Sequence, residues 1–174
     1  MTGNVATREP ETDTAVRPAL ADRIREARAR LDPPTVTIPA PRSAEGVVPA
    51  PTMRTESDAP PKDLLAAVDA LTEEIAKVEK DSDDEAHRTL CRIAALLGDG
   101  VPEAGWSAAE EIDAEVLQAT AEAARALHAK ATTLLDRLDS ESRHGPAADV
   151  GSVATTLQVV GVVADLEVFE RARQ

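Results

Sequence analysis

Proline is concentrated at one end of this chain of 174 residues, because ten of its twelve prolines fall within residues 1–61. Proline lacks a backbone N–H and interrupts helices and central strands, so this segment is unsuited to long regular elements. Residues 1–61 hold 11 large apolar residues, whereas residues 62–174 hold 29. Burial of so few apolar side chains cannot offset the entropy lost on ordering the segment. The sequence therefore predicts a disordered, proline-rich tail at residues 1–61 and a folded domain at residues 62–174.

One stretch of the tail has a helical pattern. Residues 19–31 repeat apolar side chains on one face, between Pro18 and Pro33, and a proline is favourable in the first turn and terminates a helix at its end. A helix this short is marginal by itself in water, so we expect its apolar face to need a partner. Further prolines up to residue 61 predict an extended linker to the domain. The predicted partner-binding residues are the apolar anchors Leu20, Ile24, Ala27 and Leu31, with Arg23, Arg25, Arg28 and Arg30 for electrostatic steering.

The binding site of this tail helix is left open by the sequence. The linker is long enough for the helix to dock on its own domain, in cis, and also long enough to reach another protein, in trans. In either case burial of the apolar anchors contributes more than attraction between exposed charges, which is weak at physiological salt.

Beyond residue 61 the apolar residues follow a helical period. Four helices are expected, at about 61–80, 83–97, 107–142 and 147–172. The first has the spacing of a coiled coil, and the third begins at Ser107, which forms a capping box with Glu110. The predicted fold is all-α: a disordered tail followed by an antiparallel four-helix bundle.

The last of these helices carries apolar residues on two roughly opposite sides. A helix of this kind is either buried in a core or shared with another chain. We therefore expect the second stripe to lie at the bundle centre or to mediate self-association, which makes a homo-oligomer the expected state. The first stripe is Val150, Val153, Leu157, Val160, Ala164 and Val168, and the second, the predicted self-association residues, is Val159, Val162, Leu166 and Phe169.

Residues that could carry metal or catalytic chemistry are few. His87 and Cys91 are four residues apart on one helix face, which is half of a zinc site, and only two further histidines are present. The sequence contains no phosphate-binding glycine loop and no nucleophile elbow, and it does not place a Glu-x-x-His motif on each of two helices. We therefore expect no catalytic residues, no metal and no cofactor.

Charge limits the class of partner. The net charge is −13, of which residues 1–61 contribute −1 (nine acidic against eight basic) and residues 62–174 contribute −12 (23 acidic against 11 basic). An acidic domain repels phosphate backbones, and two aromatic residues in the whole chain offer no stacking platform. Nucleic acid is therefore not an expected partner.

The expected location is the cytoplasm. A single cysteine excludes an intramolecular disulfide, and the N-terminus lacks the pattern of a secretory signal. The most apolar stretch, residues 150–169, is interrupted by Asp165 and Glu167, so no membrane span is expected. Fifteen arginines against four lysines, with abundant alanine, suggest a bacterial source.

These observations favour a non-catalytic, acidic interaction or assembly protein of the adaptor or scaffold type. It would self-associate through its last helix and dock a protein partner through the tethered N-terminal helix. The alternative hypothesis is a regulatory helical bundle that holds a small apolar ligand between its aliphatic helices.

Overall fold

The computed structural model describes residues 19–32, 59–98 and 107–174. All regular structure within these ranges is helical, which confirms the predicted all-α class. The disorder predicted for most of residues 1–61 falls on positions outside the described ranges. The helices are α1 (Leu20–Leu31), α2 (Lys62–Lys80), α3 (Glu85–Gly98), a single helical turn at 107–110, α5 (Ala114–Ser140) and α6 (His144–Ala172).

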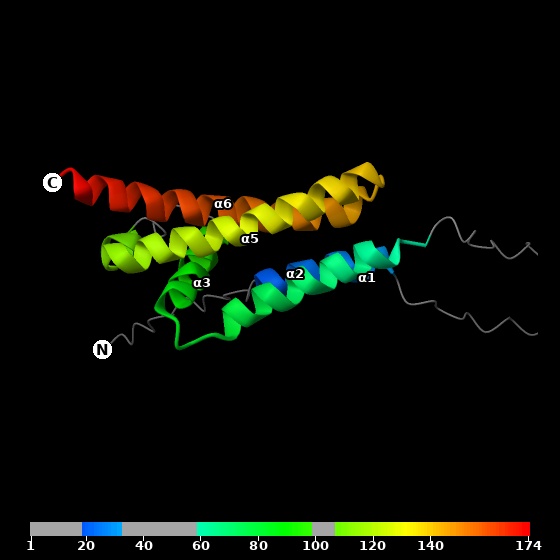
Figure 1. Cartoon of the computed structure of the whole chain (residues 1–174), viewed down its shortest axis with the longest axis horizontal. Coiled ribbons are helices and arrows are strands. Elements are labelled where there is room, and N and C mark those ends of the chain that lie inside the picture. Colours follow the sequence, from blue (N-terminus) through cyan, green and yellow to red (C-terminus); the bar gives the residue numbers. More distant parts are fainter. Residues whose placement is uncertain (1–18, 33–58, 99–106) are drawn as a thin grey trace, which may run out of the picture.

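The two longest helices, α5 and α6, lie side by side along the molecule as an antiparallel hairpin (Figure 1). Ser142, in the turn between them, has a φ of 56°, and its N–H donates to Asp139 O while the Arg143 N–H donates to Leu138 O. These two bonds form the Schellman arrangement that closes a helix C-terminus.

Small residues allow these two helices to approach each other. A Cβ built on Gly161 of α6 would lie 3.8 Å from the Ala124 Cβ of α5 and 3.9 Å from Ala121 O. Gly161 thus faces α5 directly.

A second pair, α1 and α2, lies beneath this hairpin in Figure 1. The two helices run in opposite directions, since Ala21 N donates to Glu79 Oε1 (3.3 Å) near one end of the pair and Arg28 bonds to Asp69 (3.0 Å) further along it. Helix α1 also packs against α6, and α2 also packs against α5. The remaining helix, α3, crosses the others at an angle (Figure 1) and contacts α2, α5 and α6.

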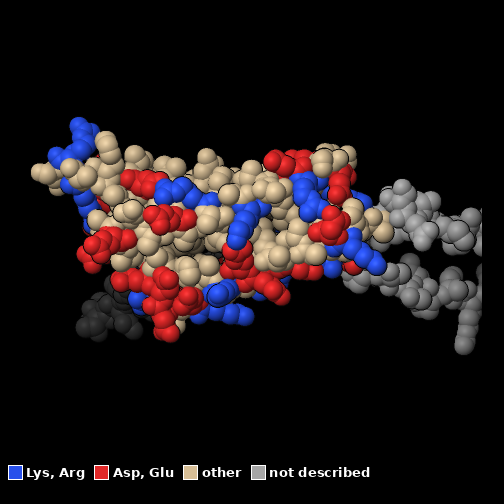
Figure 2. Space-filling model, in the orientation of Figure 1, with Lys and Arg blue, Asp and Glu red and all other residues tan. Residues whose placement is uncertain are grey.

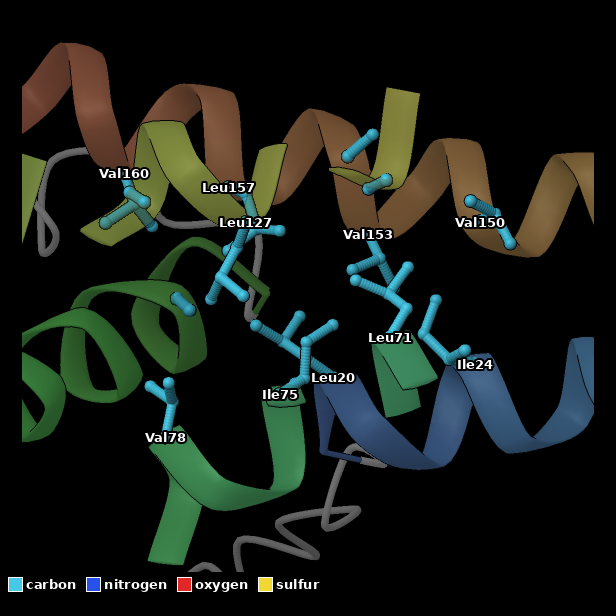
Figure 3. Packing of buried hydrophobic residues seen from close by; sticks show 14 of the residues in the cluster. Leu20, Ile24, Leu71, Ile75, Val78, Leu127, Val150, Val153, Leu157 and Val160 are labelled. Carbon is cyan, nitrogen blue, oxygen red and sulfur yellow. The ribbon is translucent and has the colours of Figure 1, made fainter. Parts of the chain in front are cut away.

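One continuous cluster of buried side chains joins all these helices. Figure 3 shows Leu71 of α2 beneath Val153 of α6, with Leu20 and Ile24 of α1 beside Leu71. The largest fully buried side chains, each less than 2% exposed, are Ile24, Leu64, Ile75, Leu90, Ile93, Leu117, Leu138, Leu157, Val68, Val150, Val153 and Val160.

The short helix in the tail is therefore part of the folded core. The predicted boundary at residue 61 does not separate α1 from the helices that follow, because α1 docks back onto α2 and α6. The antiparallel bundle of four helices within residues 62–174 is not confirmed. Its expected second member, α3, crosses the other helices, whereas α1 lies along them (Figure 1).

The helix predicted over about 107–142 is interrupted. It forms a turn at 107–110, breaks at 111–113 and restarts as α5, where the Leu117 N–H donates to Asp113 O (2.9 Å). Arg171 of α6 stabilises the break, since its guanidinium donates to the carbonyl oxygens of Ala109 (3.0 Å), Glu110 (2.7 Å) and Ile112 (2.5 Å). Carbonyls left without helical partners at the end of a turn are satisfied in this way.

Candidate functional site

The candidate site is an apolar stripe on the outer face of α6, made of Val159, Val162, Leu166 and Phe169, here called the outer stripe. These side chains are 38%, 48%, 41% and 57% exposed, and among the described residues they are the exposed large apolar side chains. They lie opposite the α6 face whose residues Val150, Val153, Leu157, Val160 and Ala164 are buried. The structure thus excludes one of the two predicted positions of the stripe, burial at the centre of its own chain.

The outer stripe has the spacing of a coiled-coil seam and is bordered by charged residues. The intervals of three, four and three residues are those of a heptad seam, which pairs with another helix. Arg173 extends the stripe at its end, with its guanidinium carbon 5.6 Å from the centre of the Phe169 ring. Asp165 flanks the stripe on the α5 side and forms an ion pair with Arg125 (2.5 Å). Figure 2 shows uncharged side chains between charged ones along the edge where α6 runs.

The predicted partner-binding anchors on α1 have a different environment. Leu20, Ile24, Ala27 and Leu31 are 7%, 0%, 0% and 3% exposed, and they belong to the cluster shared with α2 and α6. The chain itself covers this apolar face, so of the two docking modes left open by the sequence the structure shows the one in cis. Another protein could reach the anchors only by displacing α1.

The arginines of α1 hold it against its own chain. Arg28 bonds to Asp69 of α2 (3.0 Å), Arg30 to Asp149 of α6 (2.9 Å) and Arg23 to the hydroxyl of Ser152 (3.5 Å). Arg25 pairs within the helix, with Asp22. The sequence predicted attraction between this cationic helix and the acidic domain, but it gave no signal for which acidic residues would pair.

Three groups with ligand atoms within 4.8 Å of one another, Asp81, Asp84 and His87, lie at the start of α3. Hydrogen bonding at a helix N-terminus accounts for their positions. Asp84 Oδ1 accepts from the N–H groups of Ala86 (2.8 Å) and His87 (3.1 Å), and Asp81 Oδ2 lies 3.0 Å from His87 Nδ1. The hydrogen bond with His87 lowers the pKa of Asp81 below its ordinary value.

Cys91, which with His87 could have formed half of a zinc site, is not part of this group. Its side chain is half-buried on α3, and burial, with a smaller contribution from Glu79, raises the pKa of the thiol to about 11. A thiol with this pKa is protonated at neutral pH, whereas the thiolate is the nucleophile and metal ligand.

A groove of about 570 Å³ lies along α2 beside Arg25 of α1. It is open and lined by charged and small side chains: Arg25, Thr72, Glu73, Ala76, Lys77, Lys80 and Asp81. An apolar ligand is usually enclosed by hydrophobic and aromatic side chains. This groove therefore gives no support to the alternative hypothesis of an apolar ligand site.

By length and composition α6 is apolar enough to cross a membrane. In the structure, half of the most apolar 18-residue segment of α6 is buried against other helices, as in the core helix of a folded domain. Contacts with α5, α1 and α3 occupy its inner face. The apolar residues of α6 are thus divided between the core and the outer stripe.

Comparison with protein-family models gives no match, and neither the curated proteins nor the solved structures include a significant match to this chain.

Proposed function

We propose that this protein is a non-catalytic helical assembly module that self-associates through the outer stripe of α6. The observation that carries the proposal is the exposure of Val159, Val162, Leu166 and Phe169 in one line on one helix. Soluble monomers rarely expose contiguous apolar patches of this kind, and such patches usually mark interaction sites. The module would work in the cytoplasm, with its four-helix framework built from α1, α2, α5 and α6.

Other features of the chain support a binding role over a catalytic one. The protonated thiol of Cys91 is a poor nucleophile. At the start of α3, the Asp84 carboxylate is engaged in capping the helix. The strongly negative charge of residues 62–174 also supports a protein partner over nucleic acid.

In this proposal α1, the helix that the sequence predicted to dock a partner, is a structural element of its own chain. Because α1 is docked in cis, its anchors contribute to the stability of the module, and a second protein is not needed to cover them. Docking of another protein by α1 would first require release of the helix from α2 and α6.

The size of the outer stripe sets the expected strength of association. Full burial of one large apolar side chain contributes roughly 1.5–3 kcal/mol, and these side chains are already about half covered, so eight of them in a dimer contribute about 8 kcal/mol. Association costs at least about 4 kcal/mol in lost translational and rotational freedom. The remaining gain of about 4 kcal/mol corresponds to a dissociation constant on the order of 1 mM for the stripe alone.

Analytical ultracentrifugation over a range of concentrations tests the proposal. The wild-type chain should show reversible association, and the double variant Val162→Asp, Leu166→Asp should remain monomeric with an unchanged helical spectrum, because both positions are exposed. The matched control is Ala126→Asp, Ala129→Asp, which adds the same charge at exposed positions of α5. A wild-type chain that stays monomeric at millimolar concentration would contradict the proposal.

A further inference from the structure

The outer stripe has the same spacing when read from either end. From Val159 to Phe169 the intervals are three, four and three residues, and the centre falls at position 164. Two copies of α6 related by a twofold axis at this centre would place Val159 opposite Phe169 and Val162 opposite Leu166. A small side chain then faces a large one in the outer layers, which is how facing positions fill space evenly.

Charges next to the stripe also distinguish the two possible helix directions. In a parallel pair, the usual contacts between heptad positions bring like charges together. Arg173 faces Arg173 of the other copy across the seam, and on both flanks Asp165 faces Glu170 of the other copy. In an antiparallel pair, Arg173 faces Thr155, and Glu170 faces Thr156. The remaining like-charged contact is between the two copies of Asp165, each of which already has an ion pair with Arg125 of its own chain.

From this spacing and these charges we infer that the occupant of the outer stripe is a second copy of this chain, with the two α6 helices packed antiparallel about a twofold axis near position 164. The inference rests on the proposed function and adds the identity of the partner and its orientation. An isologous contact of this kind closes at two subunits, so the assembly unit is a dimer and not a filament.

A distance measurement tests the orientation. A spin label on Gln174→Cys, in a Cys91→Ala background, reports on the end of α6, which is exposed. The antiparallel dimer places the two labels about 30 Å apart, at 1.5 Å per residue over ten residues on each side of the axis. A parallel dimer places them about 10 Å apart, the usual distance between packed helices. The short distance would overturn the orientation and leave self-association intact.

Absence of any dipolar coupling at concentrations up to millimolar would overturn both this inference and the proposed function. The stripe would then be covered by a segment of the chain outside the described residues, by an unrelated protein or by a lipid surface. Sedimentation with neutral phosphatidylcholine vesicles identifies the last of these.

A charge design tests the same inference without a cysteine. In the antiparallel pair Gln158 of one copy lies beside Ala172 of the other, and both residues are exposed. The double variant Gln158→Lys, Ala172→Glu should therefore tighten the dimer roughly 2- to 30-fold, through two exposed ion pairs. The matched control, Gln158→Glu, Ala172→Glu, should weaken it. Equal dissociation constants for both variants would contradict the antiparallel arrangement.

Discussion

Helix α1 and the C-terminal half of α6 form an instructive contrast. Four arginines and two acidic residues make up half of the 12-residue α1, yet its apolar residues Leu20, Ile24, Ala27 and Leu31 are all buried. The apolar helix α6 leaves four of its largest side chains exposed near its end. Burial therefore follows the arrangement of side chains around the helix and not the average hydropathy.

Geometry explains the difference. All apolar anchors of α1 lie on one face, so contact with α2 and α6 covers them together while the arginines remain at the edge. The apolar side chains of α6 lie on two opposite faces, and the neighbouring helices of the same chain occupy the inner one. A second surface is needed to cover the outer face.

The largest expected effect tests whether α1 is as much a part of the core as α6. Ile24→Ala should lower the free energy of unfolding by about 2–5 kcal/mol, because the side chain is 0% exposed and its removal leaves a cavity. The matched change, Leu166→Ala in the outer stripe, removes a side chain that is 41% exposed, and we expect a loss below about 1 kcal/mol in dilute solution.

Urea denaturation followed by circular dichroism measures both variants at a concentration where the chain is monomeric. Equal losses for Ile24→Ala and Leu166→Ala would break the contrast between the two regions. An unchanged midpoint for Ile24→Ala would mean that α1 is detached from the core in solution.

A smaller effect distinguishes the two arginines at the end of α6. Arg171→Ala removes donors to the carbonyl oxygens of Ala109, Glu110 and Ile112, and we expect a loss of about 1–3 kcal/mol. The matched change, Arg173→Ala, affects an exposed side chain over the Phe169 ring, and its effect should stay below about 1 kcal/mol. Thermal unfolding compares the two variants, and a larger shift for Arg173→Ala would place the stabilising contact on the outer face.

Local pattern in the sequence located the helices well. The predicted segments at 19–31 and 61–80 correspond to α1 and α2, and the sequence also indicated the two-sided distribution of apolar residues on α6. These features depend on the period of the helix and on prolines and glycines, which are local properties of the sequence.

Features that depend on contacts between distant residues were not predicted. The break at 111–113 is stabilised by Arg171, about sixty residues later in the chain. The docking of α1 in cis requires Asp69 and Asp149 to lie near Arg28 and Arg30. Helical spacing shows which face of a segment is apolar, but it does not show which other segment covers that face.

A gain in stability is expected on the inner face of α6. Gly161→Ala adds a Cβ at ordinary contact distance from α5, 3.8 Å from both Ala124 Cβ and Arg125 Cγ. Alanine is favoured over glycine within a helix by about 1 kcal/mol, so the variant should be more stable by up to that amount. Gly151→Ala, with Leu135 side-chain atoms at 3.8 Å, is the matched control and should give a similar gain. A loss of stability for Gly161→Ala alone would mean that α5 and α6 pack closer at this point than the structure shows.

The smallest effect concerns a partly buried polar contact, between Asp81 and His87 at the start of α3. Since the hydrogen bond with His87 lowers the pKa of Asp81 from its ordinary 3.8, the folded state favours the carboxylate. This contribution to stability is fully present above the ordinary pKa and is lost as the pH falls through the lower pKa of the folded state. The difference in unfolding free energy between wild type and Asp81→Asn should therefore be constant at neutral pH and shrink below about pH 4.

Asp83→Asn, at an exposed neighbouring position, is the control, and its difference from wild type should change less over the same pH range. A difference that grows as the solution is acidified would reverse the sign and contradict the assignment of the pKa shift to His87.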